Sequence, residues 1–104
     1  MNYKHLMLVA DADPKAYFNY NIKPYLNKHE HYYVIYNSDI ELVGYAYRCA
    51  RIELMCDLMA YTANNRHAKN GYKYNEYIIH TFALWPDGTP RIIAMEEFWY
   101  AKAF

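Results

Sequence analysis

The sequence predicts an α+β fold: a two-layer sandwich in which two helices cover a mostly antiparallel four-stranded sheet, in the order β-α-β-α-β-β. β-Prone runs at residues 3–10 and 31–36 supply the first two strands, and a long apolar-periodic stretch at residues 39–63 supplies the second helix. Two further strand-like runs flank a turn sequence at residues 86–88 and predict a hairpin. No tract rich in Pro, Gly or Ser divides the 104 residues, so we expect a single domain spanning residues 1–104.

The first helix is expected to begin beside a proline. Asp13 can act as the N-cap, and Pro14 suits the first helical position because an N–H group is not needed there. Apolar residues at helical spacing follow, among them Ile22. Pro24 removes a backbone donor, so we expect it to break or kink the helix near Ile22.

The second helix is predicted from a capping pattern and a long periodic stretch. Ser38 followed by Glu41 matches a capping box, which predicts a helix over residues 39–63. Gly44 weakens the first turns of that helix by about 1 kcal/mol relative to alanine. A strand over residues 40–47 is therefore the alternative for this segment.

The C-terminal third is expected to form a β-hairpin. Residues 74–85 and 90–100 flank Pro86-Asp87-Gly88, which suits a type I turn followed by a glycine bulge. A three-residue loop would set the register so that Phe82 lies opposite Ile92, His80 opposite Ala94, and Ile79 opposite Met95.

The long helix and the hairpin both carry more apolar surface than one packing partner requires. A helix on a single sheet needs one apolar stripe, whereas this segment has two. The first stripe contains Leu42, Tyr45, Cys49, Ile52, Cys56 and Met59. The second stripe contains Val43, Tyr47, Ala50, Leu54, Leu58 and Tyr61. One hairpin face would carry Ile78, Phe82, Leu84, Ile92 and Phe98, and the other Tyr77, Ile79, Trp85, Ile93, Met95 and Trp99.

An apolar excess of this kind predicts an interaction surface. Exposed patches larger than a few hundred Å² usually mark binding sites, so we expect contact with a second copy or with another protein. The alternative is that the first helix covers the second stripe and leaves nothing exposed.

Tyrosine dominates the composition. The chain holds 14 tyrosines, and only a few can be fully buried because each buried hydroxyl needs a hydrogen-bond partner. The remainder would lie at the surface, where tyrosine is common at interfaces; a tyrosine-rich fold without a partner is the alternative. The 11 basic and 11 acidic residues cancel to zero net charge, which argues against a dedicated duplex-DNA binder and favours self-association.

The cysteines and the hydropathy pattern indicate a reducing compartment. Cys49 and Cys56 would lie about 10 Å apart along a helix, too far for a disulfide bond, so we expect free thiols on an apolar stripe. The apolar run at residues 6–10 is too short for a signal peptide, and no segment approaches the roughly 18 apolar residues of a membrane span. We therefore expect a cytoplasmic protein without membrane contact.

Two groups of polar residues have the donor types of a metal site. Asp11 and Asp13 follow an apolar strand and could hold Mg²⁺, although Asp13 has a simpler role as an N-cap. His29 and His31 could share a metal, but zinc sites need three or four ligands. We expect no metal, no cofactor and no catalytic residue.

A histidine and a carboxylate in the hairpin support a second hypothesis. In the expected register His80 and Glu96 share a face within diagonal reach, and such a pair can act as a general base. A small-ligand-binding or hydrolytic domain would then have its pocket between the long helix and the sheet. No nucleophile can be placed beside the pair, so the interpretation of His80 as an ordinary hydrogen-bonded histidine is favoured.

The segment between the long helix and the hairpin mixes cations with aromatic residues. Arg66, Lys69 and Lys73 lie close to Tyr72 and Tyr74. Three interpretations are open: a solvated loop, a charged rim of a protein contact, or a single-stranded nucleic-acid site over residues 66–74. Because the chain has no net positive charge, nucleic-acid binding is the least favoured.

These observations predict a small non-enzymatic protein-interaction module that covers a surface of another protein and also forms a homodimer. Compact, motif-free single domains of this kind suit phage or mobile-element inhibitors that block a host or defence complex. The residues expected to bind the partner are Tyr47, Tyr61, Arg66, Lys69, Tyr72, Lys73, Tyr74, Tyr77, Trp85, Met95 and Trp99.

Overall fold

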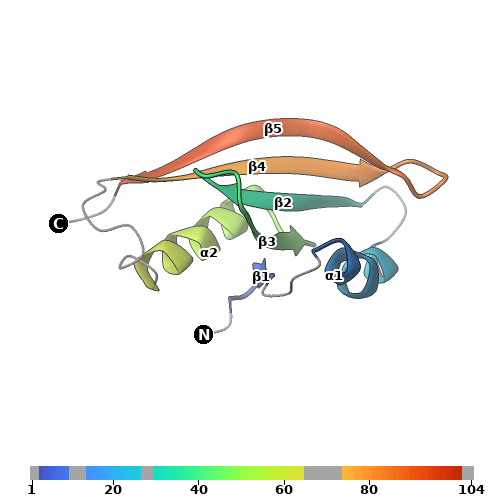
Figure 1. Ribbon diagram of the computed structural model, residues 1–104, viewed down its shortest axis with the longest axis horizontal. Coiled ribbons are helices and arrows are strands. Elements are labelled where there is room, and N and C mark those ends of the chain that lie inside the picture. Colours follow the sequence, from blue (N-terminus) through green and yellow to red (C-terminus); the bar gives the residue numbers. More distant parts are fainter. Residues whose placement is uncertain (1–2, 10–13, 27–29, 65–73, 102–104) are drawn as a thin grey trace.

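The computed structural model describes residues 3–9, 14–26, 30–64 and 74–101. Along the chain they form β1 (Met7–Leu8), α1 (Pro14–Asn21), the short 3₁₀ helix η1 (Lys23–Tyr25), β2 (His31–Asn37), β3 (Leu42–Tyr47), α2 (Arg51–Asn64), β4 (Tyr74–Leu84) and β5 (Pro90–Ala101). The strands form one sheet in the order β1-β3-β2-β4-β5, and every neighbouring pair is antiparallel (Figure 1). The predicted α+β class with two helices is confirmed, although five strands replace the expected four.

The additional strand is β3, which occupies the segment expected to begin the long helix. The prediction of a helix from residue 39 was wrong, and the alternative strand over residues 40–47 is confirmed. β3 lies between β1 and β2 and pairs with both, so tertiary pairing overrides the local helical periodicity. Packing against β1 explains why residue 44 is a glycine. A Cβ atom there would overlap the carbonyl oxygen of Met7 and lie 3.2 Å from the Cα of Leu8.

Asn37 builds the turn between β2 and β3, where the sequence predicted a capping box. Its side-chain oxygen accepts hydrogen bonds from the N–H groups of Asp39 and Glu41, each at 2.9 Å. The backbone N–H of Asn37 donates to the carbonyl oxygen of Glu41 at 2.9 Å. Ile40 closes the turn with φ 61°, in the left-handed region that a β-branched residue rarely adopts. Ser38 and Glu41 therefore belong to a hairpin turn and cap no helix.

Helix α2 begins about a dozen residues later than expected, at a different capping residue. The Oε1 atom of Glu53 accepts a hydrogen bond from the backbone N–H of Ala50 at 2.8 Å, which is one half of a capping box. The Oε2 atom of Glu53 lies 3.0 Å from Nε2 of His5. The Oδ2 atom of Asp57 accepts hydrogen bonds from the N–H groups of His5 and Leu6 at 2.7 and 2.9 Å. The first turns of α2 thus fasten the N-terminal segment to the domain.

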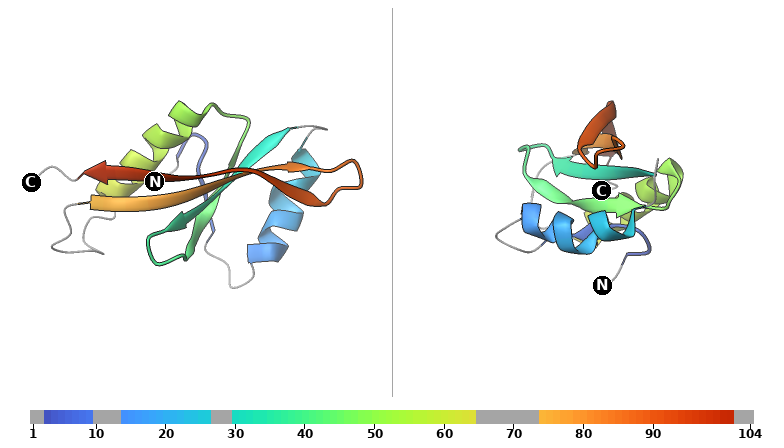
Figure 2. Two further views of the ribbon diagram at one scale, coloured as in Figure 1. Left: turned by 90° about the horizontal axis from the view of Figure 1, so that it is seen from above. Right: turned by 90° about the vertical axis from the view of Figure 1, so that its right-hand side faces the viewer.

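The two helices pack against opposite faces of the sheet. The α2-side core consists of Leu6, Ile35, Val43, Ala46, Leu54, Met55, Leu58, Tyr77 and Ile79. The α1-side core consists of Ile22, Tyr32, Val34 and Tyr45. Val34 and Ile35 are neighbours in β2, and successive strand residues point to opposite faces, so the sheet separates the helices (Figure 2, left). The expected two-layer sandwich was therefore wrong, because the sheet lies between the two helices as a middle layer.

The rest of the N-terminal half follows the prediction with smaller differences. Helix α1 ends at Asn21 and Pro24 lies within η1, which confirms the expected break near Ile22. The strand expected over residues 3–10 has only two paired residues, those of β1. Asp13, the expected N-cap, lies outside the described residues.

The β4–β5 hairpin is confirmed, and its loop has the expected chemistry. The N–H of Trp85 donates to the carbonyl oxygen of Thr89 at 2.7 Å, and the N–H of Gly88 donates to the carbonyl oxygen of Trp85 at 2.8 Å. Gly88 has φ 88°, the left-handed conformation that a glycine bulge requires. The Asp87 side chain accepts hydrogen bonds from the N–H and the hydroxyl of Thr89 at 2.9 and 2.6 Å.

The register of the hairpin shifts by one residue beyond the loop. Phe82 lies opposite Ile92 as expected, but His80 lies opposite Met95 and not Ala94. An irregularity next to Phe82 leaves Ile93 without an opposite residue, as in a β-bulge. Because opposite residues share a face, Ile92 and Met95 both project on the α1 side of the sheet. The predicted pairing of Met95 with Ile79 was therefore wrong.

Candidate functional site

Four large apolar side chains are exposed on the β4–β5 hairpin and its loop, and we call this set of residues the ribbon surface. The ribbon surface consists of Trp85, Ile92, Ile93 and Met95. Met95 is 70% exposed and Trp85 is 50% exposed. None of the four belongs to the cores that the helices form with the sheet, or is packed against those cores. Part of the apolar excess expected from the sequence thus lies at the surface.

Strand β5 forms an edge of the sheet. It is 12 residues long, and among the described residues it pairs with β4 alone (Figure 1). An edge strand presents a row of backbone N–H and carbonyl groups that another strand can bind. Two of its charges already have contacts: the guanidinium of Arg91 lies 4.8 Å from the Trp85 ring, and Glu96 accepts a hydrogen bond from Arg51 at 2.6 Å. The middle of the strand, from Ile92 to Met95, carries no charge.

Helix α2 carries the two apolar stripes that the sequence predicted, but only over its own length. Leu54 and Leu58, from the second stripe, are fully buried in the α2-side core. Ile52, Cys56 and Met59, from the first stripe, are exposed. The alternative in which the first helix covers one stripe is wrong, because α1 packs on the other face of the sheet.

The structure places the predicted partner-binding residues in different environments. Trp85 and Met95 belong to the ribbon surface, whereas Tyr47 and Tyr61 are half-buried. Tyr77 is only 4% exposed, and its hydroxyl oxygen lies 2.7 Å from the Oγ1 atom of Thr62 in the α2-side core. A surface role for Tyr77 is corrected, since it faces α2 beside a buried hydrogen-bond partner.

The other predicted contact residues are described less fully or not at all. Tyr74 and Trp99 lie in the paired ends of β4 and β5. Arg66, Lys69, Tyr72 and Lys73 lie outside the described residues, and the three interpretations of that segment stay predictions.

The His80–Glu96 pair predicted from the sequence does not form. Glu96 lies opposite Ile79, the neighbour of His80, so the two side chains point to opposite faces of the sheet. The Glu96 carboxylate faces α2 and pairs with Arg51. The His80 ring lies 5.1 Å from the ring of Tyr36 on the α1 side. The two side chains are separated because the register of the hairpin is shifted by one residue. The hypothesis of a general base built from His80 and Glu96 is therefore wrong.

The candidate metal residues are not brought together in the described part of the chain. Among the described residues, no three His, Cys, Asp or Glu side chains are arranged so that they could hold a metal ion. Asp11, Asp13 and His29 lie outside them. Glu30 pairs with Nε of Arg48 at 3.0 Å, and His31 is exposed at the start of β2. Within the described ranges no helix has the length and apolar character needed to cross a bilayer.

The two cysteines are free thiols in unlike environments. Cys49 is half-buried, and burial, with the Glu53 and Asp57 carboxylates nearby, raises its pKa to about 11. This thiol is therefore a poor nucleophile near neutral pH. Cys56 is exposed on α2, so its part of the predicted apolar stripe faces outward.

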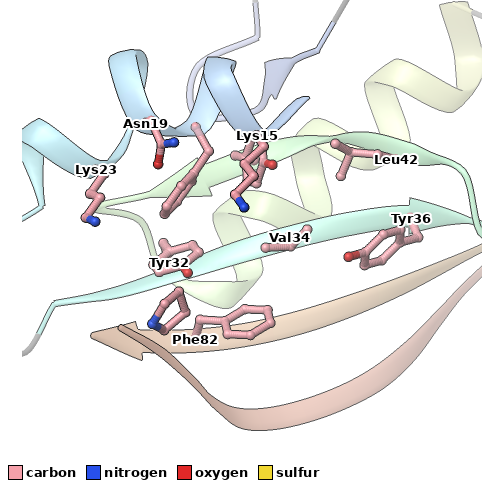
Figure 3. A pocket seen from close by; sticks show the side chains of 11 residues that line it. Lys15, Asn19, Lys23, Tyr32, Val34, Tyr36, Leu42 and Phe82 are labelled. Atoms are coloured by element: carbon pink, nitrogen blue, oxygen red, sulfur yellow. The ribbon is translucent and has the colours of Figure 1, made fainter. Parts of the chain in front are cut away.

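A second feature lies on the other helix, an open groove of about 500 Å³ between α1 and the sheet, which we call the α1 groove (Figure 3). Its lining consists of Lys15, Phe18, Asn19, Lys23, Tyr32, Val34, Tyr36, Leu42, Tyr45, Phe82 and Pro90. Aromatic and aliphatic side chains form the floor, and the polar residues of α1 and η1 form the rim. Within the described part of the chain, this lining contains no carboxylate.

Two tyrosine hydroxyls of the α1 groove, those of Tyr32 and Tyr45, stay protonated over a wide pH range. Burial raises the pKa of Tyr32 to about 12, with smaller contributions from the neighbouring hydroxyls of Tyr45 and Tyr36. Burial likewise raises the pKa of Tyr45. Tyr32 is only 3% exposed, and its hydroxyl makes no hydrogen bond to any described residue.

Two patterns in the sequence indicate this groove, and the predicted site did not include them. Lys15 and Asn19 are four residues apart on one side of α1, and Lys23 follows at the same spacing in η1. Tyr32, Val34 and Tyr36 alternate along β2 and share the sheet face that meets that helix.

The chain matches no protein-family model, no curated protein and no solved structure. The proposals below therefore rest on the geometry of the ribbon surface and of the α1 groove.

Proposed function

We propose that the chain is a non-enzymatic protein-interaction module that associates through β5, first with a second copy of itself. The observation that carries this proposal is the edge strand β5, which has β4 as its one strand neighbour among the described residues and carries the exposed side chains of Ile92, Ile93 and Met95. A strand added at this edge would make backbone hydrogen bonds, and the apolar side chains would supply contact area. The same edge can accept an extended segment of a different protein.

Charge along β5 supports pairing with a second copy. Arg91 lies near the start of the strand, and Glu97, which is exposed, lies toward its end. Two copies related by a two-fold axis would run antiparallel, so the basic end of one strand would approach the acidic end of the other. The chain carries zero net charge, so long-range repulsion between copies is small.

Acting on a different protein, such a module would work by occupying a surface that its target needs. This mode of action is the one that suits a phage or mobile-element inhibitor of a host or defence complex, and we retain that setting as part of the proposal. It requires no catalytic residue and no cofactor.

Two lysines on the ribbon surface are expected to abolish self-association. In the double variant Ile93→Lys/Met95→Lys, each pairing strand would bring charge into an apolar contact, which should weaken association at least about thirtyfold. Sedimentation velocity over the micromolar range measures this as the loss of a concentration-dependent dimer.

The matched control adds the same two charges elsewhere. Tyr20 is 77% exposed on α1 and Ile40 is 72% exposed in the β2–β3 turn, so Tyr20→Lys/Ile40→Lys should associate like the unchanged protein. Equal association of both double variants would show that the ribbon surface is not the contact.

A further inference from the structure

The α1 groove is a second candidate site, which adjoins the ribbon surface where Phe82 lies opposite Ile92. Its floor is aromatic: the ring centroid of Tyr32 lies 5.0 Å from that of Phe18 and 5.5 Å from that of Phe82, and the Tyr32 and Phe82 rings are stacked. Val34 lies between these rings and Tyr36 along β2 (Figure 3). A floor of this kind favours a flat apolar body.

Among the described residues, the charges on the rim of the α1 groove have a single sign. Lys15 and Lys23 contribute two cations and Asn19 contributes an amide, and the described lining contains no acidic residue. Figure 3 shows the Lys15 side chain reaching from α1 toward β2 across the opening. In a chain with equal numbers of acids and bases, this local excess favours an anionic ligand.

A buried hydroxyl in the groove needs a hydrogen-bond partner. Tyr32 is 3% exposed, and its hydroxyl has none among the described residues. Buried polar groups in proteins are almost always paired with protein, water or ligand. The hydroxyl of Tyr36 points along the groove toward Val34 (Figure 3). Two tyrosine hydroxyls thus lie in a groove whose rim carries Lys15 and Lys23.

We propose that the α1 groove binds a small organic anion with a flat aromatic body. The rings would lie on Val34 beside the ring cluster of Phe18, Tyr32 and Phe82, and the anionic oxygens would contact Lys15 and Lys23. The Tyr32 hydroxyl would hydrogen-bond to a polar atom of the ring system. The volume of about 500 Å³ suits a ligand of this size.

Two probes with nearly the same ring skeleton test the proposal. One is 8-anilinonaphthalene-1-sulfonate, and the other is N-phenyl-1-naphthylamine, which lacks the sulfonate. Methyl NMR of the protein reports the place of binding. The sulfonate should shift the methyl signals of Val34 and Leu42 in the groove and leave those of Ile93 and Met95 on the ribbon surface unchanged.

The charge of the rim is tested by removing both lysines. Lys15→Gln/Lys23→Gln should weaken binding of the sulfonate about tenfold, while binding of the neutral amine should change less than about twofold. Both lysines are exposed, so the fold should persist, and the methyl spectrum of the free variant checks this. The control Lys4→Gln alters an exposed lysine in the N-terminal segment and should leave both affinities unchanged.

Three outcomes would overturn the proposal. The sulfonate could shift the ribbon methyl groups instead of the groove methyl groups. Its affinity could be the same in the double-lysine variant as in the unchanged protein. The neutral amine could lose as much affinity as the sulfonate. Because sedimentation tests the ribbon surface and methyl NMR tests the groove, either proposal can fail without the other.

Discussion

Replacing Gly44 by alanine is expected to lower the free energy of unfolding by at least about 3 kcal/mol. The added Cβ would overlap the Met7 carbonyl oxygen and lie 3.0 Å from the Met7 carbonyl carbon, both of which are backbone atoms. Strand β1 would have to move away from β3 and withdraw Leu6 from the α2-side core. Urea unfolding followed by tyrosine fluorescence or circular dichroism measures the loss.

Gly88→Ala provides the matched control. Nothing lies within 4 Å of a Cβ atom at that position, so its cost comes only from the left-handed backbone and should be about 1 kcal/mol. If Gly44→Ala unfolds at the same urea concentration as the unchanged protein, β1 does not pack against β3 as described.

Leu58→Ala is expected to cost about 2–5 kcal/mol of unfolding free energy. Leu58 is fully buried in the α2-side core with Leu54 and Ile79, so truncation leaves a cavity between helix and sheet. A domain of this size has a total stability of about 5–15 kcal/mol, so the variant should unfold at a much lower urea concentration.

Met59→Ala, at the next position of the same helix, is the control for Leu58→Ala because it changes the other apolar stripe of α2. Met59 is 40% exposed, and its truncation should cost less than about 1 kcal/mol. Equal losses at Leu58 and Met59 would contradict an arrangement in which one stripe of α2 is buried and the other faces outward.

The elements that could be predicted from the sequence are those whose signals are local. Pro24 limits α1 by removing a backbone donor, and Asp87 and Gly88 define the hairpin loop by their own conformations and hydrogen bonds. The class and most of the strands followed from such signals. The prediction for residues 39–50 was wrong because the need for glycine at position 44 comes from the close approach of β1. That contact is distant in the sequence, so no local pattern reveals it.

The candidate sites were harder to predict because they depend on register and on which face each helix covers. A single bulge residue, Ile93, moves Met95 to the other side of the ribbon and separates His80 from Glu96. The aromatic floor of the α1 groove comes from three strands and a helix, so its residues are adjacent only after folding. The prediction of excess apolar surface did not depend on register, and exposed apolar side chains on the hairpin and on α2 agree with it.

Hydrogen exchange at β5, followed residue by residue as the protein concentration is raised, tests the central claim most directly. If two copies pair through this edge, the β5 amides that do not bond to β4 will exchange more slowly at high concentration, with the largest change between Ile92 and Glu97. The amides of β2, in the middle of the sheet, serve as the internal reference. Exchange rates in β5 that are the same at every concentration, in a protein that stays monomeric, would contradict the account.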